Sequence, residues 1–391
     1  MSGTQFSVDA RTWYFNGAQY STFYAVDDDS VRTELLEKAN RLNINLLRTH
    51  GGCAGQGPAN RIVGPYTLQP ESGELNESAF KLLDRAIAQS KEYGIRWILW
   101  LANNWRTTGN GAAQYVEWAT GDPIPDGGSL KPGSPASTKE YREYHDRFYT
   151  NEKAKELYKN YVRKVLTRTN TVTGVEYRND PSIVLWELLN EGQALAKNRS
   201  AYHDWIEEMA AYVSDIAPQQ LVGSGGLGTY NEIPEWTTES DADWFPSGTA
   251  MDYVTVNNID EIDACSFHTY PDSHQGHWGL TTEETKRWIR GHIKDAHEQV
   301  GKPAYNGEWG YAVQRNNDQQ QTSLETRNTL YEKYYNWYDA YDLNGSVVYH
   351  LSPGEITPRR VYSISCPQDQ RTCDLIEEYG SRVLDKSGQD V

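Results

Sequence analysis

The sequence lacks a hydrophobic run long enough to cross a membrane. Its longest apolar stretch, residues 95–102, has only the length of a buried strand, whereas a spanning helix needs about 20 apolar residues. Residues 1–4 contain no apolar signal core. We therefore expect either a cytoplasmic protein or a secreted one whose export signal has been removed, and we favour secretion.

Basic residues are scarce relative to acidic ones. The 37 Lys and Arg against 54 Asp and Glu give a net charge of −17, which disfavours nucleic acid or an anionic membrane as partner. The acids are dispersed, except for the run at 27–29. A solvated acidic surface is the simpler interpretation, and a halophilic protein from a high-salt cell is the alternative. Nothing in the sequence indicates an oligomeric state.

Cysteine is rare as well. The four cysteines form no Cys-x-x-Cys pair, so a zinc site is not expected. His274 and His277 have no third ligand at a usable spacing, and we expect no metal. Cys265 lies in a strand-like run and should be buried. Cys366 and Cys373 flank a short polar loop and could form a disulfide in an exported protein; the sequence leaves this open.

Tryptophan and tyrosine are abundant, by contrast. The chain has 13 Trp and 27 Tyr but only 7 Phe. Flat rings with one polar end suit the faces of sugars, yet the same residues also fill cores with their polar end hydrogen-bonded. The bias supports carbohydrate binding only weakly.

Strand-like and helix-like segments alternate along the chain. The expected strands are 20–25, 44–48, 95–101, 183–188, 221–224, 264–268, 304–308 and 346–349. The expected helices are 30–42, 77–93, 152–169, 201–216, one starting at the capping-box pair Thr281 and Glu284, 322–341 and 374–384. Eight strands alternating with helices predict an α/β fold, a (β/α)8 TIM barrel.

The length of 391 residues fits one such catalytic domain, 1–391, with a short C-terminal extension from about residue 352. Long insertions follow three strands, at 49–76, 103–151 and 225–263. Loops that follow barrel strands lie on the C-terminal face, where barrel active sites are built. We therefore expect a site shaped by long loops on that face.

Polar residues gather at the ends of five predicted strands. They are Arg48, Asn103-Asn104-Trp105, Asn190-Glu191, His268-Thr269-Tyr270 and Glu308-Trp309. Each alone has a structural explanation, such as a salt bridge at the barrel end or a hydrogen-bonded buried imidazole. Their coincidence at one end of the strands indicates a site.

Two of these residues, Glu191 and Glu308, form the carboxylate pair that retaining glycoside hydrolysis uses. Glu308 would attack the anomeric carbon while Glu191 protonates the leaving oxygen and later activates water. Arg48 and Tyr270 are the expected partners of Glu308, and Asn190 would hold the sugar's 2-hydroxyl. The assignment predicts carboxyl groups about 5–5.5 Å apart, whereas about 9 Å would indicate inversion.

Several segments resemble the endo-β-1,4-mannanases of glycoside hydrolase family 5. They are 101–105, 152–191, 262–272 and 302–310, within a similarity that extends from about residue 6 to residue 351. The segments 103–105 and 148–150 resemble the mannanase branch more specifically.

The resemblance implies Glu191 as acid/base, Glu308 as nucleophile, β-mannan as substrate and no cofactor. It also implies an active-site shell of Arg48, Asn190, His268 and Tyr270, with Trp105 lining the glycone side of the cleft. Asn104 and Trp309 adjoin these residues and complete the predicted substrate-binding set, together with Tyr349.

The chain departs from the family's usual pattern at three places. Gly192 stands where a proline usually follows the Asn-Glu pair, and Tyr349 stands where a tryptophan usually forms the platform under the sugar. Residues 223–226 are Gly-Ser-Gly-Gly where the mannanases usually carry acidic residues. The first two departures concern the geometry at the cleaved bond, and the third concerns the preference for mannan.

The leading hypothesis is therefore a retaining endo-β-1,4-mannanase acting on mannan, glucomannan or galactomannan. A β-glucanase or an exo-acting β-mannosidase on the same barrel is the alternative, and product length distinguishes exo from endo action. A non-catalytic sugar-binding barrel is the remote alternative, which the presence of both glutamates disfavours.

Overall fold

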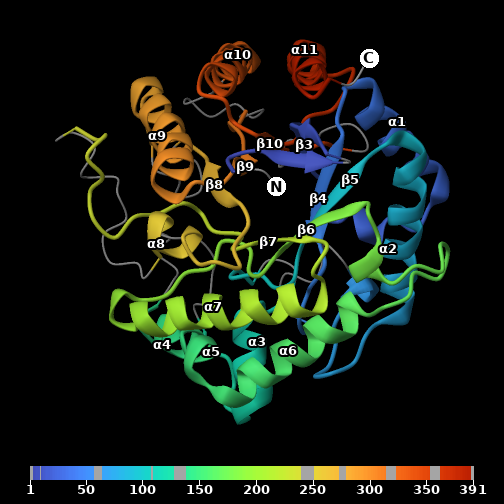
Figure 1. Cartoon of the computed structure of the whole chain (residues 1–391). Helices are drawn as coiled ribbons and strands as arrows, with labels where there is room; N and C mark the ends of the chain where they lie inside the picture. Colours follow the sequence, from blue (N-terminus) through green and yellow to red (C-terminus); the bar gives the residue numbers. More distant parts are fainter. Residues whose placement is uncertain are drawn as a thin grey trace.

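The computed structural model describes residues 3–8, 10–56, 64–106, 109–126, 138–238, 251–272, 279–313, 323–352 and 362–388. Its centre is a parallel sheet of eight strands rolled into a barrel (Figure 1). The strands are β3 (Phe15–Gln19), β4 (Leu46–His50), β5 (Arg96–Trp100), β6 (Ile183–Glu187), β7 (Leu221–Gly223), β8 (Cys265–Thr269), β9 (Ala304–Trp309) and β10 (Gly345–Tyr349). Their order is β7-β6-β5-β4-β3-β10-β9-β8, and a parallel bridge between Gly223 and Ala264 closes the ring. The predicted (β/α)8 barrel is confirmed.

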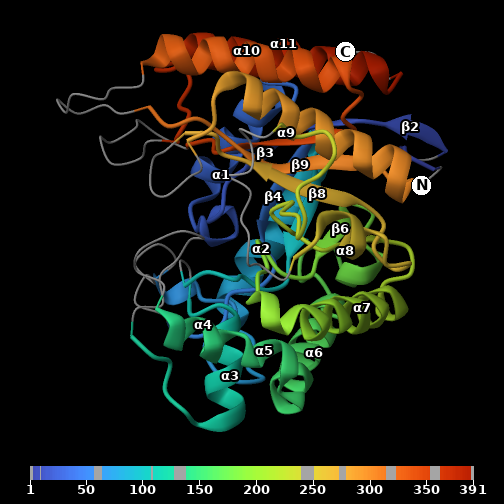
Figure 2. The same cartoon turned by 90° about the vertical axis from the view of Figure 1, so that its left-hand side faces the viewer.

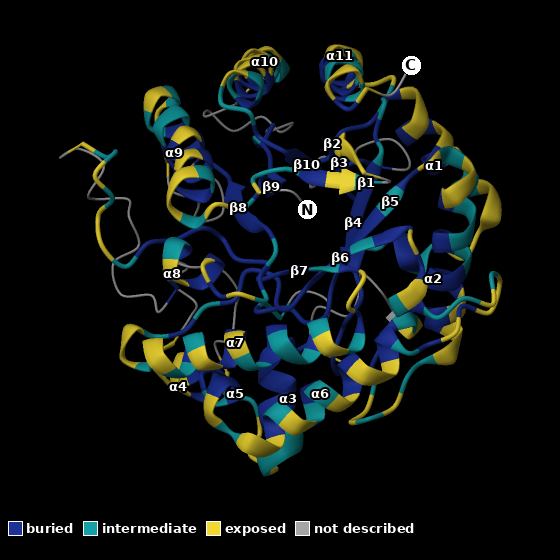
Figure 3. Cartoon of the chain, viewed as in Figure 1, coloured by how far each residue is buried: buried dark blue, intermediate teal, exposed yellow. Residues whose placement is uncertain are grey.

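Helices surround the barrel and turn one buried side toward it (Figure 3). They are α1 (Asp29–Arg41), α2 (Glu77–Ser90), α3 (Ala112–Thr120), α4 (Lys139–His145), α5 (Arg147–Thr150), α6 (Glu152–Leu166), α7 (Arg199–Ile216), α8 (Tyr253–Asn257), α9 (Thr282–Asp295), α10 (Leu324–Ala340) and α11 (Gln370–Lys386). The predicted capping box is present, because the Thr281 hydroxyl accepts from the Glu284 amide while the Glu284 carboxylate accepts from the Thr281 amide. Helices α10 and α11 lie side by side on one edge of the molecule (Figure 2).

A short antiparallel hairpin of β1 (Phe6–Val8) and β2 (Arg11–Trp13) lies at the N-terminal end of the barrel. Phe6 and Trp13 join the apolar cluster that fills the barrel interior, which also contains Phe15, Leu46, Ile98, Leu185, Ala264, Tyr305 and Val347. Because side chains alternate along a strand, the residues two positions beyond Leu46, Leu185 and Val347 face the same interior at the next level up. Polar groups inside the barrel are thereby gathered at its carboxyl end.

The predicted first strand, 20–25, is wrong. The first barrel strand is β3, and Phe23–Ala25 forms a short 3-10 helix, η1. The cause is that β3 contains residues whose contacts are distant in sequence. The Asn16 side-chain amide donates to the carbonyls of Leu42 and Ile376, and a Cβ on Gly17 would lie 2.9 Å from the Ser346 carbonyl oxygen. The other seven strands lie within two residues of their predicted bounds.

The long insertions contain helices that were not predicted. Helices α3, α4 and α5 lie within 103–151, and α8 lies within 225–263. The C-terminal extension contributes α11, which packs against α10 and β3.

The open question about the cysteines is answered by a disulfide between Cys366 and Cys373. Cys265 is buried, as predicted. His274 and His277 lie outside the described residues. Among the helices that the structure describes, none has the length and apolar character needed to cross a bilayer.

Candidate active site

The guanidinium of Arg48 lies at the centre of the barrel's carboxyl end, with no exposed surface. Its Nε and Nη2 donate to Glu187 at 3.0 and 2.6 Å. Its Nη1 donates to Glu308 at 2.6 Å and to Gln19 at 2.8 Å, and Nη2 also reaches the Asn190 Oδ1 at 2.7 Å. One cation thus connects four strands or strand ends through a fork of fixed geometry.

Burial by itself lowers the pKa of Arg48, but the charges of Glu187 and Glu308 outweigh it, and the pKa lies above its ordinary value. Arg48 therefore stays cationic. The Cζ atom of the Arg48 guanidinium lies over the Trp100 ring, 4.5 Å from its centroid, in a cation–π contact.

Both carboxylate oxygens of Glu308 accept hydrogen bonds. Arg48 donates to Oε1, and the Tyr270 hydroxyl donates to Oε2 at 2.9 Å. Burial, and then the neighbouring Glu308, raise the pKa of Tyr270 well above its usual value, so its phenol keeps the proton that it donates. Glu308 is held in one orientation at the top of β9.

Glu191 follows β6 on a turn whose backbone is in the left-handed region, with φ of 54°. Residues other than glycine rarely adopt this backbone conformation, and such strain is characteristic of functional positions. One oxygen of Glu191 lies 2.8 Å from His268 Nδ1, and the other accepts from the Trp105 indole. The partners of Glu191 are therefore an imidazole and an indole, whereas Glu308 is paired with the cation of Arg48.

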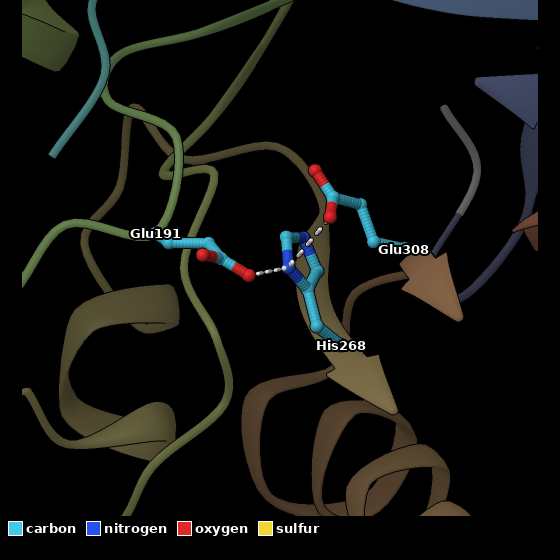
Figure 4. Close-up of side chains that lie close together, drawn as sticks. All are labelled: Glu191, His268 and Glu308. Carbon is cyan, nitrogen blue, oxygen red and sulfur yellow. Dashed lines mark hydrogen bonds and ion pairs between the residues drawn. The ribbon is translucent and has the colours of Figure 1, made fainter. Parts of the chain in front are cut away.

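His268 stands between the two carboxylates (Figure 4). Its Nδ1 lies 2.8 Å from Glu191 and 4.0 Å from Glu308. One oxygen of each glutamate and the His268 nitrogen all lie within 4.8 Å of one another. An approach of the nearest oxygens within 4.8 Å is compatible with carboxyl groups about 5–5.5 Å apart, the separation of a retaining pair.

The same three residues have the spacing of a metal site. However, each of their four carboxylate oxygens already has a protein hydrogen-bond partner, namely His268, Trp105, Arg48 or Tyr270. A metal is thus not needed to explain the cluster. A second group with this spacing, His203, Asp204 and Glu207 on α7, lies at the surface.

Most of the predicted site residues come together at this end of the barrel. Asn190 bridges Arg48 and Asn103, to which its amide nitrogen donates at 3.2 Å. The side chain of Asn104 accepts from the Gln193 amide at 3.2 Å and so holds the loop that follows Glu191. Tyr349 is partly exposed, and its ring packs edge-to-face on Tyr270 with centroids 5.8 Å apart.

Trp309 is the exception, and its prediction as a substrate-binding residue is wrong. Its side chain has no exposed surface and packs against four tyrosines of α10, namely Tyr331, Tyr334, Tyr335 and Tyr338. The register of β9 shifts against both neighbouring strands. Glu308 consequently faces the barrel interior while Trp309 faces the helix layer.

Two residues of the site were not predicted. Glu187 is fully buried and accepts from Arg48 and from the Tyr305 hydroxyl, the latter at 2.9 Å. Gln19 ends β3 and accepts from Arg48. A signal for Glu187 was present in the sequence, since a lone glutamate inside an apolar strand needs a buried cation; Gln19 gave none.

Known proteins resemble this chain in sequence and in fold. Residues 1–346 match the family described as GH family 5 beta-mannosidase-like. Mannan endo-1,4-beta-mannosidase 1 of Arabidopsis thaliana is 33% identical over 358 residues, which cover 88% of this chain and 78% of the relative. Mannan endo-1,4-beta-mannosidase 4 of Solanum lycopersicum is 33% identical over 79% of this chain and 71% of its own length. The endo-1,4-beta-D-mannanase of Thermotoga petrophila RKU-1 superposes with a TM-score of 0.77 and 28% identity, covering 95% of this chain and all of that one.

The position of Arg48 generates a prediction about stability. Arg48→Met leaves Glu187 as a buried charge without its cation, and we expect the free energy of unfolding to fall by about 3–5 kcal/mol. Chemical denaturation measures it. The double variant Arg48→Met/Glu187→Leu should recover part of the loss, because no unpaired charge remains at Glu187.

Arg147→Met is the matched control. Arg147 pairs with Asp122 at 2.9 Å, but both side chains are well exposed, so its loss should cost less than about 1 kcal/mol. Equal destabilisation of the Arg48 and Arg147 variants would contradict the central role of the buried guanidinium.

Proposed function

The chain belongs to the β-mannosidase-like family of glycoside hydrolase family 5, and from this membership we propose that it is a retaining endo-β-1,4-mannanase. Its substrates are the internal β-1,4-mannosidic bonds of mannan, glucomannan or galactomannan. The observation that carries the proposal is the close pair of Glu191 and Glu308 with different partners, a histidine and an indole on one and a cation and a phenol on the other.

The first step forms a covalent intermediate. Glu308 attacks the anomeric carbon, a new carbon–oxygen ester bond forms, and the glycosidic bond breaks. Glu191 gives its proton to the departing oxygen, so the leaving sugar carries a neutral hydroxyl. Arg48 and Tyr270 hold Glu308 in line with the carbon that it attacks.

The second step releases the sugar with its original configuration. Glu191, now ionised, takes a proton from water as the water oxygen attacks the anomeric carbon. The ester bond breaks, and its electron pair returns to Glu308. Two inversions at one carbon give net retention.

The surrounding residues divide the remaining tasks. His268 orients Glu191 through the bond at Nδ1. Asn190, whose amide is fixed by Arg48, is the candidate to bind the 2-hydroxyl, an interaction that strengthens in the transition state. Tyr349, partly exposed at the end of β10, is the candidate platform under the sugar.

A β-glucanase or an exo-acting β-mannosidase uses the same pair of carboxylates, so those alternatives differ from the proposal in substrate and product length. The names of the relatives at 33% identity favour endo action on mannan. Endo action predicts that the viscosity of galactomannan falls early, before many reducing ends are released.

Substitution of either glutamate should lower kcat, for a different chemical reason in each case. Glu308→Gln removes the nucleophile, and we expect kcat on β-mannan to fall about 10³-fold or more. Glu191→Gln removes the proton donor and should lower kcat on β-mannan by about 10²–10⁴-fold. Reducing-end release measures both.

A 2,4-dinitrophenyl β-mannobioside separates the two roles, because this leaving group needs no proton. With this substrate Glu191→Gln should show a fast first turnover and then slow release, which azide accelerates because it attacks without a general base. Glu308→Gln should show no fast first turnover with this substrate and should form no β-glycosyl azide. Formation of a β-glycosyl azide by Glu308→Gln but not by Glu191→Gln would reverse the assignment.

We propose in addition that the protein is halophilic. The support is the net charge of −17, whose self-repulsion opposes the compact state and is screened by salt. The melting temperature and mannan hydrolysis should hold or rise between 0.1 and about 2 M NaCl. A steady decline of both above moderate salt would overturn this proposal.

We also propose that the protein is secreted. A disulfide between Cys366 and Cys373 favours an oxidising compartment, and a polysaccharide substrate lies outside the cell. Immunoblotting of native culture medium and cell lysate should place the chain in the medium with Cys366 and Cys373 unreactive to alkylation. A chain confined to the lysate with alkylated thiols contradicts it.

A further inference from the structure

The C-terminal segment 362–369 lies beyond the 346 residues that match the family, yet it packs against the site. Its start forms a short parallel pairing with the end of β10, in which the Ile364 amide donates to the His350 carbonyl at 2.9 Å and the Ser352 amide to the Ile364 carbonyl at 2.8 Å. The segment is therefore attached to the strand end that carries Tyr349.

Two further connections fix the other end of this segment. Arg327 of α10 forms a fully buried ion pair with Asp369 at 3.1 Å. The disulfide from Cys366 to Cys373 ties the segment to the first turn of α11.

Tyr362, at the start of the segment, completes a group of three tyrosine rings. Its centroid lies 5.4 Å from that of Tyr270 and 6.0 Å from that of Tyr349, and Tyr270 and Tyr349 are 5.8 Å apart. All three pairs are edge-to-face, the arrangement that aromatic quadrupoles favour. Tyr270 is the ring whose hydroxyl donates to Glu308.

The hydroxyl of Tyr362 is anchored as well. It donates to Asp272 Oδ1 at 2.8 Å, and Asp272 follows Tyr270 by two residues in the segment after β8. Burial, and then the charge of Asp272, raise the pKa of Tyr362 well above its usual value. The phenol of Tyr362 therefore keeps the proton that it donates.

The backbone beneath the three rings leaves them little room to shift. A Cβ on Gly310 would lie 2.9 Å from the Tyr349 carbonyl oxygen, 3.2 Å from Tyr362 Cδ1 and 3.4 Å from Tyr270 Cε1. Gly310 follows the nucleophile by two residues. The rings thus pack directly on the chain that presents Glu308.

We propose that Tyr362 is a positioning residue of this enzyme: anchored by Asp272, its ring holds Tyr270 in the orientation that directs the Tyr270 hydroxyl to Glu308. The inference rests on the proposed glycosidase function. Tyr362 touches neither glutamate through any contact described above and acts through Tyr270. The three tyrosines form a small cluster with Ala312, apart from the main hydrophobic core, so disturbing it should affect the site more than the fold.

A double-mutant cycle tests this route. Tyr362→Phe keeps the ring but removes its anchor and leaves the buried Asp272 without that donor. We expect kcat on mannan to fall about 5–20-fold, with KM changed less than about twofold. Once Tyr270→Phe has removed the bond to Glu308, adding Tyr362→Phe should lower kcat by less than about twofold more.

Tyr379→Phe is the matched control, a buried tyrosine of α11 whose ring stacks on Tyr335 at 4.3 Å, away from the glutamates. It should leave kcat unchanged while shifting the melting temperature by about as much as Tyr362→Phe does. Asp272→Asn, which keeps an acceptor oxygen, should retain more activity than Asp272→Ala.

Three results would overturn the proposal: wild-type kcat in Tyr362→Phe, losses in the double variant that multiply, or equal kcat in Asp272→Asn and Asp272→Ala. Inactivity of the wild-type chain on every β-mannan contradicts the proposed function instead. In that case the cycle is run on the β-glycan that the wild type does cleave, where it still decides the role of Tyr362.

Discussion

The buried positive charge of Arg48 is the constraint on which the site depends. Moving a cation of this size out of water costs several kcal/mol of solvation free energy. Only well-placed negative partners offset that cost. Glu187 supplies one full negative charge, and Glu308 supplies the other. Because Glu308, the proposed nucleophile, is one of the two counter-charges, the fold's own electrostatics fix its place in the barrel before any substrate arrives.

This network can exist only at one level of the barrel. Below it, the interior is closed by an apolar layer and by the hairpin that contributes Phe6 and Trp13. Strand alternation places Arg48 and Glu187 one interior position above Leu46 and Leu185. The apolar layer therefore does more than stabilise the barrel: it excludes water from one side of the ion network and strengthens each charge–charge contact.

The sequence allowed most of this to be predicted where local chemistry decides the outcome. Short apolar runs located seven strands, and polar residues after those runs located both glutamates and Arg48. The failures have a common cause in contacts between distant residues. Strand β3 was missed because Asn16 and Gly17 make their contacts with residues far along the chain. Trp309 was assigned to the wrong face because a shift of register between strands leaves no local trace.

Glu187 and Tyr362 show the same limit from two sides. The glutamate was visible as a charge in an apolar run, but its partner could be named only once β4 and β6 were known to be two strands apart in the ring, with β5 between them. Tyr362 gave no signal, because its importance comes from Tyr270 and Asp272, about 90 residues earlier. A residue that acts through contacts with distant residues leaves no local sequence pattern from which its role could be predicted.

The pairing of β3 with β10 has a consequence for how the protein is made. It joins residues 15–19 to residues 345–349, and α11 then packs back on β3. A ribosome makes β3 about 330 residues before it makes β10. The ring cannot close, and Glu308 cannot meet all its neighbours, until β10 has emerged. A nascent chain that already carries both glutamates therefore stays inactive until that strand is made.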